Sequence, residues 1–262
     1  MEIAFDAIGL EISNETAFND LAEDVGKRGE VSILQRKGGI LHGRCLKFGA
    51  GLEVWALFYQ SGKGEVIYAD CRPAFRARYE QEISPWILTE SNEDGEAVIH
   101  GFIENSETEV LFQLQNLTEV GTRVLEQTKL RVGLCGLAYR AEIVEKKEKP
   151  VWKSYDEIAL NVIENENDWQ LSGRVIAFET LRNPRSGNDL FWIYVDLGEL
   201  KLEILVNQRA LHGEKLQIGA FIKADIWLQG HILNETAKRK GYEGVDWSIR
   251  PVDFWKTFKK PN

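Results

Sequence analysis

The chain has 262 residues, of which 44% are hydrophobic and 28% are charged, and its formal net charge is −9. This composition is typical of a soluble globular protein with one large or two ordinary domains. The negative charge disfavours nonspecific nucleic-acid binding, which draws its affinity from neutralising phosphates.

The cysteines and the N-terminus indicate a cytoplasmic protein. Cys45, Cys71 and Cys135 are odd in number and contain no closely spaced pair, which favours reduced thiols over a disulfide framework. The first residues lack the basic and apolar regions of a signal peptide. The longest apolar stretches, such as Val54–Tyr59, are too short to cross a bilayer. The four histidines show no metal-ligand spacing, so we expect no metal and no cofactor.

The first 95 residues predict a helix followed by a β-meander. Asn14 or Ser13 can cap a helix that Gly26 ends, because Ala17 to Val25 place apolar side chains on one helical face. Strands bounded by Gly-rich turns are predicted at Glu30–Leu34, Leu41–Phe48, Leu52–Gln60 and Glu65–Ala69. A second helix is predicted at Asp70–Ile83, because Pro73 suits a first helical position. The polar segment Ser91–Gly95 marks a module boundary.

The rest of the chain predicts more strands around one helix. The strands expected before this helix are Ala97–Ile103, Glu109–Gln115 and Lys129–Val144, with a short helix at Thr118–Gln127. Ser154 and Glu157 form a capping box in a predicted linker helix. The last module is predicted to contain strands at Trp169–Thr180, Leu190–Leu197, Leu200–Val206, Leu216–Gln229 and Val245–Arg250, with a helical turn at Gln208–His212.

A weak internal repeat suggests the architecture. Leu171–Ile176 is similar to Ile99–Ile103, and Lys215–Gly219 is similar to Lys129–Gly133. The strand order of the last module is that of an OB-fold, a small five-stranded Greek-key barrel. We therefore predict a mainly β protein with some α, in which an N-terminal α+β portion precedes two repeated small OB-like barrel modules. The predicted domains are 1–90 (α+β), 91–149 (short β module), 150–168 (linker helix) and 169–262 (OB-like). The alternative is that any apolar hairpin with a glycine resembles another.

One candidate site is the basic and aromatic segment that contains Arg72, Arg76 and Tyr79. On the predicted helix the two arginines lie one turn apart, where guanidinium groups could bind a carboxylate or phosphate and Tyr79 could stack on a planar ligand. The alternative is a surface helix whose arginines pair with Glu80 and Glu82.

The second candidate site is the loop that contains Arg182 and Arg185, together with Trp192 on the following strand. In an OB-fold the loop between the first two strands contributes to ligand contact. The alternative is a mobile hairpin tip. The corresponding loop of the earlier module, 104–109, is acidic, so the two modules are not expected to bind the same ligand.

Three functions follow as hypotheses. The leading one is a non-enzymatic binding protein for a protein partner or an anionic ligand. The second is a single-stranded nucleic-acid-binding protein, which the net charge disfavours. The third is an enzyme that acts on an anionic small molecule. No catalytic motif marks a nucleophile, so we do not expect an enzyme, and the oligomeric state is left open.

Overall fold

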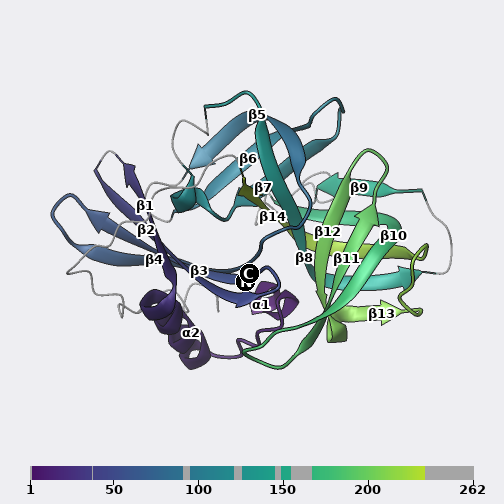
Figure 1. The fold of residues 1–262 in the computed structure, drawn as a ribbon, viewed down its shortest axis with the longest axis horizontal. Coiled ribbons are helices and arrows are strands. Elements are labelled where there is room, and N and C mark those ends of the chain that lie inside the picture. Colours follow the sequence, from purple (N-terminus) through teal and green to yellow (C-terminus); the bar gives the residue numbers. More distant parts are fainter. Residues whose placement is uncertain are drawn as a thin grey trace, which may run out of the picture.

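The protein is mainly β, as the sequence predicts: of the residues that the structure describes, 61% lie in strands, which form two sheets, and 12% lie in helices. The structure, a computed structural model, describes residues 2–36, 38–90, 95–120, 126–144, 149–154 and 167–233. The four-stranded sheet lies at the left of Figure 1 with one helix below it and a shorter helix near the centre, and the strands of a larger sheet occupy the top and the right.

Two helices begin the chain. Helix α1 (Glu2–Ala7) is absent from the sequence predictions, whereas α2 (Glu15–Arg28) was expected. Asn14 caps α2 as predicted, since its side-chain oxygen accepts a hydrogen bond of 2.9 Å from the amide of Ala17. Gly26 does not end the helix but lies buried within it, and Gly29 follows the last turn.

The smaller sheet is a meander of consecutive antiparallel strands: β1 (Glu30–Arg36), β2 (Gly39–Gly49), β3 (Leu52–Ser61) and β4 (Val66–Phe75). The prediction of a helix at Asp70–Ile83 is therefore wrong. Residues 70–75 pair with β3, and Pro73 is tolerated because β4 pairs along one side only. All six residues from Asp70 to Phe75 are buried, which leaves no solvent face for an amphipathic helix.

The larger sheet contains the remaining strands. They are β5 (Gln81–Glu90), β6 (Ala97–Ile103), β7 (Glu109–Leu114), β8 (Leu130–Val144), β9 (Val151–Ser154), β10 (Asp168–Arg182), β11 (Asp189–Asp196), β12 (Lys201–Asn207), β13 (Leu211–Gly213) and β14 (Phe221–Ile232). Single 3-10 turns follow β7 and β12, namely η1 (Leu117–Glu119) and η2 (Gln208–Ala210). The strand β5 lies within the predicted domain 1–90, yet it pairs with β6 beyond it.

Some predicted elements fall wholly or partly outside the described residues. The predicted linker helix 150–168 overlaps β9 and the first residue of β10. Ser154 of its predicted capping box is the last residue of β9, whereas Glu157 and the predicted apolar face lie in 155–166, which are not described. The predicted strand Val245–Arg250 is likewise outside them. Of the predicted helix Thr118–Gln127, the described part contains only the end of η1.

The pairings of the larger sheet close into two rings of five strands. In the first ring the order is β5–β6–β7–β14–β8, and β8 returns to β5. In the second ring the order is β10–β11–β12–β8–β14, and β14 returns to β10. The long antiparallel pair β8–β14 therefore belongs to both rings. In each ring one pair is parallel, β7 with β14 and β12 with β8, while the other four are antiparallel.

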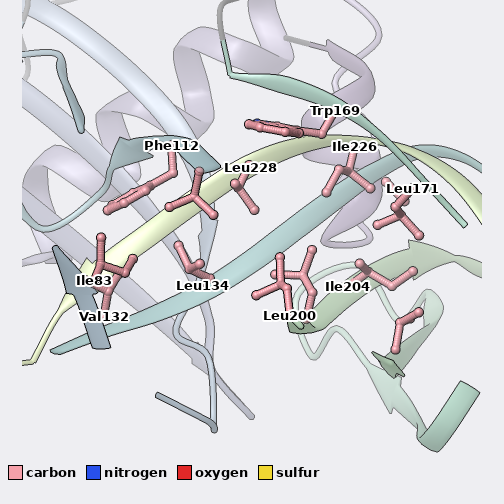
Figure 2. Packing of buried hydrophobic residues seen from close by; sticks show 14 of the residues in the cluster. Ile83, Phe112, Val132, Leu134, Trp169, Leu171, Leu200, Ile204, Ile226 and Leu228 are labelled. Carbon is pink, nitrogen blue, oxygen red and sulfur yellow. The ribbon is translucent and has the colours of Figure 1, made fainter. Parts of the chain in front are cut away.

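One hydrophobic core fills both rings. Figure 2 shows side chains that line β8 and β14, among them Leu134, Ile226 and Leu228, with Phe112 from the first ring and Ile204 from the second. A second core joins α1, α2 and the smaller sheet to the outer sides of β8, β11, β12 and β14. The outer sides of the rings are therefore covered in some places by the N-terminal portion and open in others.

Candidate functional site

Arg72 does not form an open anion site. Its side chain is fully buried, and Nη1 lies 3.3 Å from Oδ2 of Asp70. Nη2 donates to the carbonyl oxygen of Leu114 at 3.3 Å, which ties β4 to the end of β7. Arg72 thus joins the smaller sheet to the first ring.

Arg76 is part of a buried ionic network at the same junction. Its Nε donates to Glu53 at 2.9 Å, and Nη2 donates to Glu119 at 3.0 Å. His231 on β14 and Trp55 also contact the Glu53 carboxylate, with Nε2 and Nε1 at 3.3 and 3.1 Å. Burial alone would raise the pKa of Glu53, but hydrogen bonds and positive charge from His231 and Arg76 lower this pKa to about 2. The guanidinium group of Arg76 is therefore paired with two carboxylates of the protein itself, those of Glu53 and Glu119.

The loop 182–188 contacts the N-terminal helices. Asn183 is fully buried, and its Nδ2 donates to the carbonyl oxygen of Ile8 at 2.7 Å. Arg185 forms an ion pair with Asp24 of α2. Arg182 extends into solvent and lies 4.0 Å from its neighbour Asp189. Asn183 and Arg185 therefore hold the loop against the N-terminal helices.

Trp192 and Tyr79, predicted as members of different sites, lie together on the outer side of the second ring. Tyr79 stacks on Tyr194 with ring centroids 4.4 Å apart and planes at 12°, and its centroid lies 6.3 Å from that of Trp192. The guanidinium carbon of Arg78 lies 4.4 Å from the Trp192 ring centroid, a cation–π contact. We call Trp192 and Tyr194 the second aromatic face. The segment between β4 and β5 covers it.

A buried carboxylate holds this segment in place. Glu203 on β12 accepts hydrogen bonds from the backbone amides of Arg78 and Tyr79 at 2.7 and 2.6 Å, and from Trp192 Nε1 at 2.5 Å. Burial raises the pKa of Glu203, although these donors act against that shift. Glu179 pairs with the Arg78 guanidinium at 2.6 Å. The covering residues are therefore specifically bound through backbone, ring and charge.

The first ring carries an aromatic cluster on its own outer side, which the sequence analysis missed. Trp86 on β5 lies with its ring centroid 5.2 Å from that of His100 and 6.3 Å from that of Phe102, both on β6. We call these three residues the first aromatic face. Trp86 is 67% exposed, and the next residue, Ile87, is exposed as well. The two-residue spacing of His100 and Phe102 within the predicted strand Ala97–Ile103 is the sequence signal that puts them on one face, and the alternation of buried and half-buried residues in β6 agrees with it.

An acidic hollow of about 400 Å³ adjoins the first aromatic face. Its walls come from the β6–β7 and β11–β12 hairpins and from β9, and its charged lining residues are Glu107, Glu109 and Glu199. Trp152 and Trp169 also line it, and their rings stack with centroids 4.2 Å apart. We call this the acidic hollow.

The hollow and the face form one surface. Glu109 lines the hollow, and its carboxylate forms a hydrogen bond with Nε2 of His100 in the first aromatic face. The indole of Trp152 donates to the carbonyl oxygen of Glu109 at 2.9 Å, which fixes the wall between the two parts. An exposed indole thus lies beside an acidic cavity with an aromatic wall.

Another hollow of about 400 Å³ lies on the second ring, over β8, β10 and β14. Its lining carries charges of both signs, and some of them pair with each other, as Arg140 does with Asp225 at 2.8 Å. Gln170 also donates to Asp225, at 3.3 Å. This hollow therefore does not select ligands by the sign of their charge.

Comparison with known protein families finds none that matches the chain, and comparison with curated proteins finds no similar sequence. Within the part of the chain that the structure describes, no helix is long and apolar enough to cross a membrane. The same residues contain no group of three His, Cys, Asp or Glu side chains arranged to hold a metal ion.

Proposed function

We propose that the protein is a non-enzymatic, cytoplasmic binding protein that takes polypeptide ligands on the first aromatic face. The observation that carries this proposal is the exposure of Trp86, a 67% exposed indole grouped with His100 and Phe102. Large exposed aromatic groups on a folded surface are typical of interaction sites.

The ring topology supports the proposal, because we interpret both rings as OB-like. An OB-fold has the closed strand order 1-2-3-5-4 with a parallel pair between strands 3 and 5. The first ring has this order along the chain, and the second ring has it when β8, which precedes β10, is taken as its strand 5. The 3-10 turns η1 and η2 follow the third strand of each ring, where an OB-fold places its helix. In this interpretation β8 is strand 4 of the first ring and strand 5 of the second, and β14 has the reverse roles. OB-folds bind ligands across the outer face of strands 2 and 3.

The same interpretation assigns a new register to the internal repeat. Ile83 pairs with Ile103, and Val175 pairs with Val195, so counterparts lie 92 positions apart on both strands. The counterpart of β10 is then β5, and not the strand at Ala97–Ile103 that sequence similarity suggested.

With this register the two aromatic faces correspond. His100 corresponds to Trp192, and Phe102 corresponds to Tyr194. In the second ring the chain's own Tyr79 stacks on this pair, while in the first ring Trp86 lies beside it and remains exposed. Among the described residues, a segment of the chain therefore covers the second aromatic face, and none covers Trp86 in the first.

The alternatives receive less support from the geometry. A nucleic acid on the first aromatic face would bring phosphates toward Glu107, Glu109 and Glu199. An enzyme for anionic substrates would need free guanidinium groups, but Arg72 and Arg76 bind carboxylates of the chain.

The test is selection of a displayed random dodecapeptide library on the purified protein, with the oligonucleotide dT20 titrated in parallel. We expect enriched peptides whose affinity falls about tenfold or more in Trp86→Ala, the loss expected from removing an aromatic anchor. Ile218→Ala is the matched control, because Ile218 is 70% exposed and lies elsewhere on the second ring. The proposal is overturned if no peptide is enriched, if binding is insensitive to Trp86→Ala, or if dT20 binds in a Trp86-dependent manner.

A further inference from the structure

We infer that the polypeptide ligand carries an aromatic side chain one or two positions from a lysine or arginine, and that the basic group enters the acidic hollow while the aromatic ring packs on Trp86. This inference rests on the proposed function and adds the chemical class of its ligand.

The second aromatic face shows which chemistry such a surface binds. Its occupant is a basic residue followed by an aromatic one, Arg78 and Tyr79, at a bend in the chain. The bend directs both side chains to the face, where the guanidinium lies over Trp192 and pairs with Glu179. Tyr79 stacks on Tyr194 at the same time. The fold therefore already makes two kinds of contact on this face: stacking of two aromatic rings, and a cation held between an indole and a carboxylate.

The first ring offers the same two kinds of contact at two adjacent places, the first aromatic face and the acidic hollow. Trp86 and Phe102 supply the aromatic surface. The acidic hollow supplies carboxylates together with the indole of Trp152, a combination that stabilises an organic cation. The hydrogen bond between His100 and Glu109 joins the two places directly.

The charges of the hollow favour a cation. Among the described residues that line it, Glu107, Glu109 and Glu199 are acidic and none is basic. Hydrogen bonds from Ser106 and Thr108, at 2.6 and 2.9 Å, lower the pKa of Glu199 and keep this carboxylate ionised. Glu109 is already bonded to Nε2 of His100, so Glu107 and Glu199 are the groups that a ligand cation would pair with.

The spacing follows from backbone geometry. In an extended peptide residues i and i+2 point to the same side, and at a bend adjacent residues can do so. A basic residue one or two positions from an aromatic one can therefore reach both parts of the surface.

The test uses four synthetic peptides of equal length whose central pair is Arg-Tyr, Arg-Ala, Glu-Tyr or Ala-Ala, titrated by fluorescence anisotropy. We expect the Arg-Tyr peptide to bind at least about tenfold more tightly than the other three. Its affinity should fall about tenfold in Trp86→Ala and again in the double variant Glu107→Gln, Glu199→Gln, and it should weaken with added salt. Glu214→Gln removes an exposed carboxylate on the second ring and is the matched control, expected to bind as the wild type does.

The outcomes separate this inference from the proposed function. If library peptides bind in a Trp86-dependent manner but contain no basic residue and are unaffected by the double variant, the ligand class is wrong and the binding function stands. If the Glu-Tyr peptide binds as tightly as the Arg-Tyr peptide, the ligand class is wrong as well. If no peptide binds in a Trp86-dependent manner, both fail.

Discussion

Substitution of Glu53 by Gln tests the network that joins the smaller sheet to the first ring. The Glu53 carboxylate is buried and contacts Arg76, His231 and Trp55 at once. Its pKa falls from an ordinary 4.5 to about 2 in the folded protein. At about 1.36 kcal/mol for each unit of pKa, the ionised side chain contributes about 3 kcal/mol to the free energy of unfolding at pH 7. Loss of one partner from a buried ion pair costs about the same amount.

The direction of the pH dependence follows from the lowered pKa. The stabilisation by Glu53 is complete above about pH 4.5 and decreases as the pH falls toward 2, because the unfolded chain takes up the proton first. The difference between wild type and Glu53→Gln should therefore shrink from about 3 kcal/mol at pH 7 to about 1.5 kcal/mol at pH 3.

Urea unfolding followed by circular dichroism at pH 7, 5 and 3 measures this difference. Glu30→Gln is the control, since Glu30 pairs with Lys47 at 2.8 Å in an exposed position and should lose less than about 1 kcal/mol. The reasoning is refuted if Glu53→Gln is as stable as the control at pH 7, or if its deficit does not change between pH 7 and pH 3.

Three further predictions concern the remaining contacts. Tyr79→Ala should lower the free energy of unfolding by about 1–2 kcal/mol, because Tyr79 stacks on Tyr194. It should also increase the acrylamide quenching of tryptophan fluorescence by exposing Trp192, and this increase should be absent when Trp192 is replaced by Phe. Unchanged quenching would contradict the covering role of Tyr79. Asn183→Ala should lower the free energy of unfolding by about 1–3 kcal/mol and speed amide exchange in α1, because Asn183 bonds to Ile8. Arg182→Ala in the same loop should lower it by less than about 0.5 kcal/mol. Equal effects of the two substitutions in urea unfolding would contradict the structural role of Asn183. The thiols of Cys45, Cys71 and Cys135 are buried, and this burial raises the pKa of each. Their labelling with a disulfide reagent should therefore be slow in the folded protein and fast in urea. Rapid labelling of the folded protein would contradict this.

Local sequence patterns predicted most of the strands because apolar runs and Gly-rich turns are visible within short windows. Ring closure was not predictable in the same way, since β8 and β14 each serve two rings and their pairings join segments some 90 residues apart. The helix prediction at Asp70–Ile83 failed because tertiary contacts bury Arg72 with Asp70, which no local pattern reports.

The candidate site was predictable in part. The sequence singled out Tyr79 and Trp192, but only the fold brings them into contact. It missed Trp86, because a tryptophan is buried by default and its exposure depends on the packing of the whole ring. It assigned ligand roles to Arg72 and Arg76, whose charges the fold uses in internal ion pairs.

The central claim is that the first aromatic face is the open ligand surface of this protein. The dissociation constant of the Arg-Tyr peptide, measured for wild type, Trp86→Ala and Ile218→Ala, tests this claim most directly. We expect the peptide to bind about tenfold or more weakly to Trp86→Ala and with unchanged affinity to Ile218→Ala. Equal dissociation constants for wild type and Trp86→Ala would contradict it.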